Sequence, residues 1–191
     1  LEVWSSQYST WVNYVDTITT FDQQEPTGFV NRTDSTFSFD NGTRTFTISP
    51  VGASYTVYWR GTRYEIDQTY NVQIADTPGT HIIKFKTDGT GIEEGLTLSI
   101  NEDIPIAWIV WDSLNQEAIF IAEERHGVTM DSKTHEYLHN INGYVWVSGS
   151  ELGDFTTTGN GSSITHTQFS LTSGRYFDED IEIDIVDTAT P

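Results

Sequence analysis

Three histidines and one glutamate are the residues whose types and spacing could do chemistry. His135, Glu136 and His139 spell His-Glu-x-x-His, and His126 stands a few residues before them. On a helix, two histidines four residues apart share one face and can bind zinc, while the glutamate can activate a water molecule. The motif therefore raises a metal-dependent hydrolase that uses His135, Glu136 and His139 as one hypothesis.

The surroundings of this motif argue against catalysis. Flanking turn residues predict a short helix at about 131–141, with Asp131 or Ser132 as its N-cap and Asn142-Gly143 at its end. Asn142 stands three residues after His139, where the extended metzincin motif requires glycine, and no histidine follows at the right distance. We therefore expect a protein that is not an enzyme.

The histidines themselves allow two interpretations. Tertiary folding could bring His126 to His135 and His139 and make a structural metal site. Alternatively, the three side chains cap, pack or hydrogen-bond near the end of a helix. We expect no catalytic residues and no cofactor, apart from this possible structural metal.

Two acidic stretches could also do chemistry. Glu123-Glu124 stand beside Arg125 and His126, where paired carboxylates could act as acid and base. Neighbouring side chains on a strand point to opposite faces, so we expect one glutamate to pair with Arg125 and the other to be solvated. The acidic run at 178–184 could bind calcium, but it lacks the glycine spacing of a calcium loop and favours a solvated edge strand.

The composition excludes several classes of function. The net charge of −19, from 28 acidic and 9 basic residues, opposes binding to nucleic acid or to an anionic membrane surface. Cysteine is absent, which excludes disulfides and cysteine-bound zinc. No run approaches the ~18 apolar residues of a membrane span, so we expect no membrane insertion. The missing initiator Met suggests a piece of a longer polypeptide.

Abundant threonine and short alternating runs predict an all-β fold, an antiparallel β-sandwich or barrel-like module with one short helix. Asn41-Gly42 between two alternating runs predicts a hairpin. The apolar runs Ile104–Trp111 and Ala118–Ala122 predict a central hairpin that is covered on both faces. We divide the chain into a connector (1–27), a β-sandwich body (28–147) and a loop-rich C-terminal extension with an acidic edge strand (148–191).

The first twenty residues carry large apolar side chains at spacings of three and four, namely Trp4, Tyr8, Trp11, Val15 and Ile18. This spacing is typical of a heptad seam, although the serines and threonines between these positions are poor helix formers. We expect either a helical oligomerisation segment that buries the tryptophans between chains or an extended connector.

Three stretches together carry a family resemblance: GFVNRTDSTFSFDNGTRTFTISP (28–50), VYWRGTRYEI (57–66) and PIAWIVWDSLNQEAIFIAEERHGVTMDSKTHEYLH (105–139). Over about residues 21–185 the chain resembles a module of tail-fibre and other virion structural proteins of tailed bacteriophages. The resemblance implies a non-enzymatic all-β module in an oligomeric virion appendage or decoration, and it carries over no catalytic residues.

We therefore expect a structural component of a phage virion, a tail-fibre or other surface-appendage segment that oligomerises and takes part in host attachment. The expected partners are further copies of the chain, in a trimer, and other virion proteins. The alternative is a carbohydrate-binding β-sandwich, viral or secreted, whose aromatic side chains stack on bacterial surface glycans. The metal-dependent hydrolase is the third hypothesis.

Overall fold

The computed structural model describes residues 2–5, 10–13, 26–100, 102–128, 130–159 and 167–188. Within these ranges the protein is an all-β, antiparallel, sandwich-like fold with one α-helix and no closed barrel. The predicted all-β fold class is confirmed. Of the two predicted architectures, the structure is sandwich-like and not a closed barrel. No helix in the described ranges combines the length and the apolar character that crossing a membrane requires.

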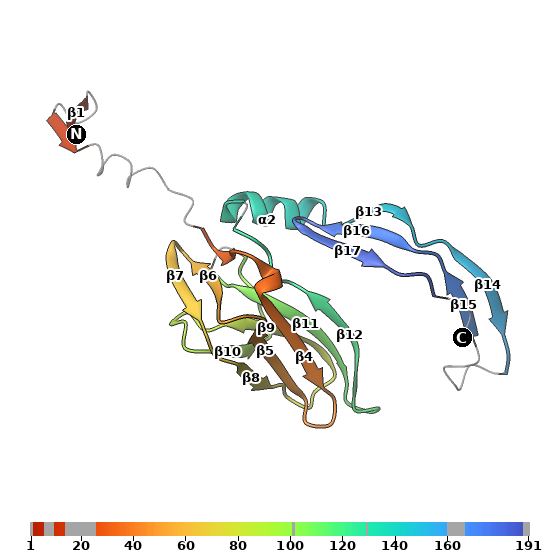
Figure 1. Ribbon diagram of the computed structural model, residues 1–191. Coiled ribbons are helices and arrows are strands. Elements are labelled where there is room, and N and C mark those ends of the chain that lie inside the picture. Colours follow the sequence, from red (N-terminus) through yellow and green to blue (C-terminus); the bar gives the residue numbers. More distant parts are fainter. Residues whose placement is uncertain are drawn as a thin grey trace.

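The body of the protein, residues 26–128, consists of packed antiparallel sheets (Figure 1). One sheet has the order β10-β9-β11-β12, formed by β9 (Gly79–Phe85), β10 (Ile92–Gly95), β11 (Pro105–Asp112) and β12 (Glu117–Glu123). Facing it lie the sheet β4-β5-β8, formed by β4 (Ser35–Asp40), β5 (Thr45–Pro50) and β8 (Tyr70–Gln73), and the sheet β3-β6-β7, formed by β3 (Gly28–Phe29), β6 (Tyr55–Trp59) and β7 (Thr62–Ile66). A short 3-10 helix, η1 (Arg32–Asp34), joins β3 to β4.

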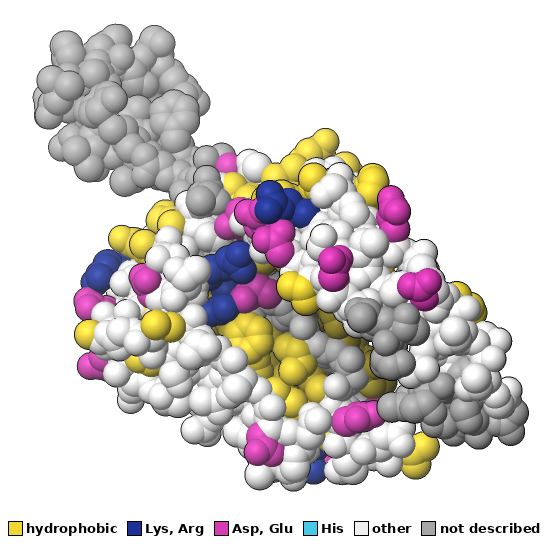
Figure 2. All heavy atoms as spheres, turned by 45° about the vertical axis from the view of Figure 1, so that its right-hand side comes forward, with side chains coloured by type: hydrophobic (Ala, Val, Ile, Leu, Met, Phe, Trp, Pro, Cys, Tyr) yellow, Lys and Arg dark blue, Asp and Glu magenta, His cyan; other side chains and the backbone are white. Residues whose placement is uncertain are grey.

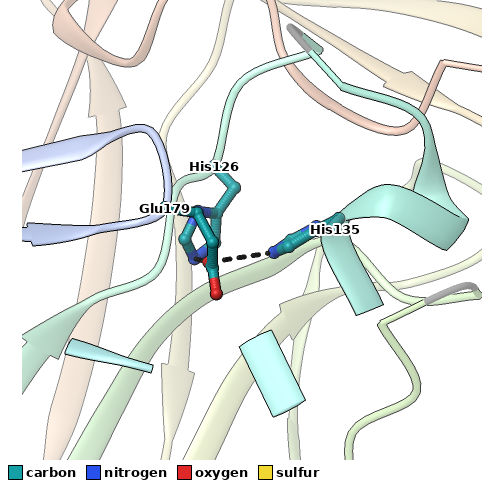
Figure 3. Close-up of side chains that lie close together, drawn as sticks. All are labelled: His126, His135 and Glu179. Atoms are coloured by element: carbon teal, nitrogen blue, oxygen red, sulfur yellow. Dashed lines mark ion pairs between the residues drawn. The ribbon is translucent and has the colours of Figure 1, made fainter. Parts of the chain in front are cut away.

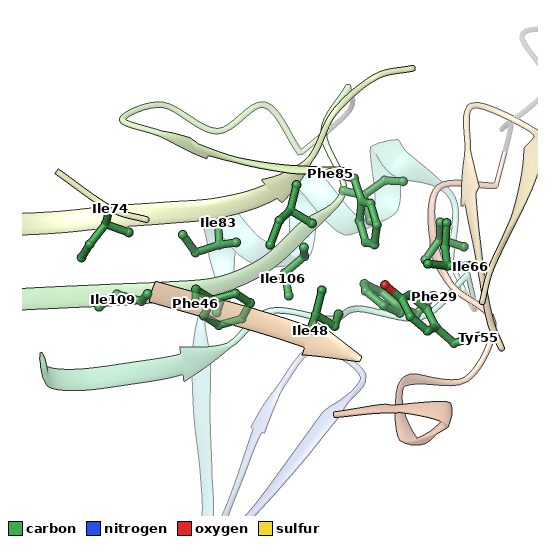
Figure 4. Packing of buried hydrophobic residues seen from close by; sticks show 14 of the residues in the cluster. Phe29, Phe46, Ile48, Tyr55, Ile66, Ile74, Ile83, Phe85, Ile106 and Ile109 are labelled. Atoms are coloured by element: carbon green, nitrogen blue, oxygen red, sulfur yellow. The ribbon is translucent and has the colours of Figure 1, made fainter. Parts of the chain in front are cut away.

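The hydrophobic core lies between these sheets (Figure 4). Phe46 and Ile48 of β5 belong to the same fully buried cluster as Ile83 of β9 and Ile106 and Ile109 of β11. Burying one such large apolar side chain stabilises the fold by about 1.5–3 kcal/mol. The core therefore gives the body a rigid frame on which a functional site can be positioned.

The predicted hairpins are mostly confirmed, with one correction. β4 and β5 pair around Asn41-Gly42, as the turn residues predict. β11 lies in the middle of its sheet and is largely buried, as expected. The prediction that Ala118–Ala122 is covered on both faces is wrong, because β12 forms the edge of the described sheet and leaves Ile119 and Phe120 more than half exposed.

After the body come a helix and a second group of strands. Helix α2 (Ser132–Ile141) begins at the N-cap Asp131, as predicted. The strands that follow are β13 (Tyr144–Gly149), β14 (Leu152–Thr157), β15 (Thr167–Leu171), β16 (Gly174–Asp178) and β17 (Ile181–Ile185). They form the sheets β13-β16-β17 and β14-β15, which together we call the arm.

The arm extends away from the body beyond α2 (Figure 1). The sequence places the strand at 144–147 in the body, whereas the structure pairs β13 with β16 of the arm. β17 is an edge strand, as predicted, and buries Ile181 while leaving Glu182 and Asp184 exposed.

Of the helical and extended alternatives for the N-terminal segment, the structure has the extended one where it describes that segment. β1 (Glu2–Ser5) and β2 (Thr10–Asn13) form an antiparallel pair whose register sets Trp4 opposite Trp11 along the backbone. Valine, threonine and tryptophan favour strands, and the serines and threonines lower helix propensity, so local preference outweighs the heptad-like spacing. Tyr8, Val15 and Ile18 of the predicted seam lie outside the described residues.

Candidate metal centre

The body supplies His126, which is fixed by the strand beside it. The backbone amide of Phe29 donates to the carbonyl oxygen of His126 at 2.8 Å, and the amide of Val128 donates to the carbonyl of Phe29 at 3.0 Å. Gly28 permits this close approach, because a Cβ at that position would lie 2.6 Å from the carbonyl oxygen of His126. Its φ of +129° is also a conformation that favours glycine. The His126 backbone is therefore held against β3.

Helix α2 supplies His135 and His139. The Asp131 carboxylate accepts hydrogen bonds from the backbone amides of Lys133 and Thr134, at 3.0 and 2.9 Å, and so fixes the start of the helix. Residues four apart lie on the same helix face, so both imidazoles reach one side of α2. The His135 side chain is buried, and that of His139 is three-quarters buried.

The arm supplies carboxylates from the turn between β16 and β17. Asp178 pairs with Ile181 in the ladder, which leaves Glu179 and Asp180 as the two turn residues. Glu179 has a φ of +48°, in the left-handed region that costs energy for a residue with a Cβ. Its side chain is nevertheless only 1% exposed. The strained backbone at Glu179 therefore directs the carboxylate of this residue into the interior.

These side chains converge on one point (Figure 3). The Nε2 atoms of His126 and His135 each lie 3.4 Å from Oε2 of Glu179. On the other oxygen of that carboxylate, Oε1, Nδ1 of His139 lies 3.4 Å away. Glu124 approaches from the end of β12, with its Oε2 3.5 Å from Nε2 of His126. Body, helix and arm thus each contribute to a single cluster.

The atoms that face one another in this cluster have no hydrogen-bond partners. Among the described residues, ten buried side-chain nitrogen and oxygen atoms lack a partner, and seven of these are in the cluster: Oε2 of Glu124, Nε2 of His126, Nε2 of His135, Nδ1 of His139, Oδ2 of Asp178 and both carboxylate oxygens of Glu179. Native proteins leave only a few buried polar atoms unsatisfied, and an ion is one explanation when they gather in one place.

The distances in the cluster favour a metal ion over direct ion pairs. Charge-assisted hydrogen bonds between nitrogen and oxygen are about 2.7–2.9 Å long. A tetrahedral zinc ion with bonds of about 2.1 Å holds its ligand atoms about 3.4 Å apart. The separations of 3.4 Å from Oε2 of Glu179 to His126 and to His135 match the second value. His126, His135 and Glu179 each offer one ligand atom within a mutual distance of 4.8 Å.

Asp180 orients His126 through Nδ1, the ring nitrogen that does not face Glu179. Its Oδ1 lies 2.8 Å from Nδ1 of His126, and its Oδ2 accepts a hydrogen bond from the amide of Gly127 at 2.7 Å. A carboxylate bound to the far nitrogen of a metal-binding histidine fixes the tautomer and raises the basicity of the near nitrogen. The arrangement leaves Nε2 of His126 free to act as a ligand.

Burial and mutual charge strongly perturb these groups. Burial lowers the pKa of His126, but the carboxylates of Asp180 and Glu124 outweigh it and raise the pKa to about 10. Burial, together with the charges of His126 and His139, lowers the pKa of His135 to about 4. Burial raises the pKa of Glu179, and the nearby charge of Asp178 acts in the same direction. Such a concentration of perturbed groups is typical of a functional site.

The structure brings together the three histidines that the sequence singled out. It leaves Glu136 outside the groups of described residues that could share an ion; this side chain is partly exposed and lies 3.5 Å from Nζ of Lys133. One prediction about the neighbouring acids is confirmed, because Glu123 pairs with Arg125 at 2.5 Å. The expectation that the other glutamate is solvated is wrong, since Glu124 is buried beside His126.

The prediction of a solvated acidic run is wrong for its first residues. The side chains of Asp178 and Glu179 are buried in the cluster, whereas Glu182 and Asp184 are exposed on the edge strand. Sequence reasoning therefore missed four carboxylates of the site, at Glu124, Asp178, Glu179 and Asp180. The only local signal is an acidic pair at a two-residue turn between apolar strands, which does not identify a partner.

Comparison with known proteins adds no relatives. No family model matches the chain, no curated protein matches it, and no solved structure matches its fold. The resemblance to a phage virion module, the expected glycan binding and the expected localisation therefore stay predictions. The functional inference rests on the site itself.

Proposed function

We propose that the protein is a non-enzymatic structural module in which one transition-metal ion, of the Zn²⁺ class, fastens helix α2 and the arm to the body. The observation that carries this proposal is the convergence of unpartnered buried ligand atoms from all three parts. His126 comes from the body, His135 from α2 and Glu179 from the arm, and they form the core of the proposed site. His139 lies beside the second oxygen of Glu179, in a neighbouring group with Asp178, and so flanks this core.

The chemistry of the donor atoms indicates the class of ion. Imidazole nitrogens with one carboxylate suit zinc and other late first-row ions, whose bonds to nitrogen are about 2.0–2.1 Å long. Calcium and magnesium prefer sites made of oxygen ligands. Three histidines at one carboxylate therefore favour zinc over the calcium that the acidic run alone would suggest.

The lack of room for a substrate beside the site favours a structural role over catalysis. Structural zinc sites use four protein ligands, whereas catalytic sites keep one position open for water or substrate. The pocket that adjoins His126 and His135 has room for about one water molecule and none for a peptide substrate. Glu136, the residue that would activate water in a His-Glu-x-x-His hydrolase, is not among the described carboxylates close to the histidines. The proposed ion therefore ties chain segments together.

A metal titration with matched variants tests the proposal. The purified full chain is stripped with a chelator, titrated with zinc by calorimetry, and its metal content is measured after desalting. We expect one zinc ion per chain, and an affinity at least 100-fold lower in Glu179→Gln, which keeps the shape of the side chain. Glu182→Gln, on the exposed face of the same hairpin, is the control and should bind as wild type does. Wild-type protein that takes up no stoichiometric zinc would refute the proposal.

A further inference from the structure

The outer part of the arm exposes a large amount of apolar surface. Six large side chains on β13, β14 and β15 are between 42% and 68% exposed: Val145, Trp146, Val147, Leu152, Phe155 and Phe169. Val145, Trp146 and Val147 are consecutive on one strand, so they project from both faces of the sheet. The rings of Phe155 and Phe169 stack across β14 and β15, with centroids 6.4 Å apart. Among the described residues, nothing covers either face of this part of the arm.

The exposed apolar area is large enough for one side of a stable protein–protein interface. At roughly 100 Å² for each half-exposed large side chain, the six present on the order of 600 Å² of apolar surface. A standard interface buries about 800 Å² on each partner, of which about 60% is apolar. Monomeric proteins rarely expose patches larger than a few hundred Å². The outer arm therefore has the apolar area of one complete side of an interface.

Charge is depleted in the same region. Residues 144–157 and 167–171 contain only Glu151 and Asp154 as charged side chains, although the whole chain carries 28 acidic and 9 basic residues. Loss of charge together with enrichment in aromatic side chains characterises the core of an interface. The acidic surplus of the chain thus lies away from this surface.

The backbone of the arm also offers unpaired edges. Among the described strands, β13 and β17 are the edges of their sheet, and β14 and β15 have only each other as neighbours. A two-stranded sheet is marginally stable in water without further packing. An association that covers the arm would supply this packing.

The same chain displays a second uncovered apolar surface, on the body. Ile119 and Phe120 on the edge strand β12 are 67% and 55% exposed, and Leu114 in the adjoining turn is 88% exposed. We call these three residues the β12 strip. Figure 2, in which the side of the molecule that carries the arm comes forward, shows hydrophobic side chains lining a hollow in the middle of the view. A chain with two such surfaces is suited to head-to-tail contacts between identical copies.

We propose that the outer arm of one copy docks on the β12 strip of a second copy. The contact is apolar and joins two acidic chains, so salt strengthens it by screening their mutual repulsion. This inference goes beyond the metal centre and is measured independently of it. Repetition of the contact gives a closed dimer or ring, or an open filament, according to the angle between successive copies.

Light scattering and sedimentation equilibrium of the full chain test the contact. We expect wild type to self-associate, and the double variant Trp146→Glu, Phe155→Glu to associate at least tenfold more weakly. The pair Ile119→Glu, Phe120→Glu should show the same loss. Leu96→Glu, at an exposed apolar residue of the body outside both surfaces, is the matched control and should leave the mass unchanged. Circular dichroism verifies that each variant is folded.

Mixing the variants gives the decisive result. Protein with an altered arm still has an intact strip, and protein with an altered strip still has an intact arm. Their equimolar mixture should therefore form a one-to-one complex through the single remaining contact, although neither variant associates alone. A wild type that is monomeric at all concentrations, or an arm variant with the wild-type mass, would overturn the proposal and assign the apolar arm to a different partner.

Discussion

His126 and Asp180 meet across the junction between the body and the arm, with Nδ1 of the imidazole 2.8 Å from Oδ1 of the carboxylate. The second oxygen of Asp180 accepts a hydrogen bond from the backbone amide of Gly127 at 2.7 Å, so both carboxylate oxygens have a partner. This pair gives the proposed metal centre an oriented ligand. It also makes the arm a part of the site, because Asp180 and Glu179 occupy the same turn.

Asp180→Ala should weaken zinc binding by about 10–100-fold, the usual effect of removing a carboxylate behind a metal-binding histidine. The physical reason is the loss of the hydrogen bond that fixes the orientation and tautomer of His126. Competition with a chelator of known affinity measures the change. Asp184→Ala, whose side chain is 63% exposed on the same hairpin, should bind zinc as wild type does. Equal affinities in the two variants would contradict the assigned role of Asp180.

Gly28→Ala should destabilise the fold and weaken zinc binding together. The added Cβ would lie 2.6 Å from the carbonyl oxygen of His126, and the φ of +129° is strained for alanine. Such backbone strain should lower the free energy of unfolding by about 1–3 kcal/mol. Urea denaturation measures this change. Gly52→Ala, where a Cβ would meet nothing within 4 Å, is the control and should change stability by less than about 0.5 kcal/mol. A Gly28→Ala variant with the stability and zinc affinity of wild type would show that β3 does not fix His126.

Glu136→Gln distinguishes the structural centre from a hydrolase. Glu136 forms a helix-surface ion pair with Lys133 at 3.5 Å, and such pairs contribute about 0.3–0.5 kcal/mol. We expect the variant to retain the zinc affinity of wild type and nearly all of its stability. A peptidase assay on zinc-loaded wild type should show no cleavage. Cleavage that disappears in the variant would establish catalysis and refute the structural role.

The carboxylate of Asp76 should make the stability of the body depend on pH. Hydrogen bonds from Nε1 of Trp111 and from Gln116, each 3.0 Å long, lower the pKa of Asp76 in the folded protein. Its contribution is therefore present above the unfolded-state pKa of about 3.9 and is lost as the pH falls through the lower folded-state pKa. Urea unfolding should show wild type more stable than Asp76→Asn at neutral pH, with the difference shrinking in acid. A difference independent of pH would argue against this linkage.

The sequence predicts the body of the fold well where the signals are local. Asn41-Gly42 specifies the β4–β5 hairpin through turn chemistry, and Asp131 specifies the start of α2 through its cap. Prediction from the sequence fails where the burial of a strand depends on which other segments cover it. The run Ala118–Ala122 is apolar on successive positions and predicts burial, yet its strand is a sheet edge in the single chain. A second copy on the β12 strip would account for this discrepancy.

The candidate site could be predicted only in part for a similar reason. The His-Glu-x-x-His spacing identifies His135 and His139 because both lie on one helix, and His126 precedes them closely in the sequence. Glu179 stands forty residues after His139, and only the pairing of β16 with β13 and β17 returns it to the histidines. Such long-range contacts follow from the topology of the chain. An acidic run read by itself therefore suggests a solvated edge.

Amide hydrogen exchange of the full chain, with and without zinc, tests most directly whether the ion joins body, helix and arm. Exchange reports local opening, and a ligand that bridges segments slows the opening of each of them. The account predicts that zinc slows exchange in α2 and in the β16–β17 turn of wild type, while β5 and β11 in the core remain unchanged. Glu179→Gln should abolish the effect. Zinc that leaves α2 and this turn as open as in the stripped protein would contradict the proposed role.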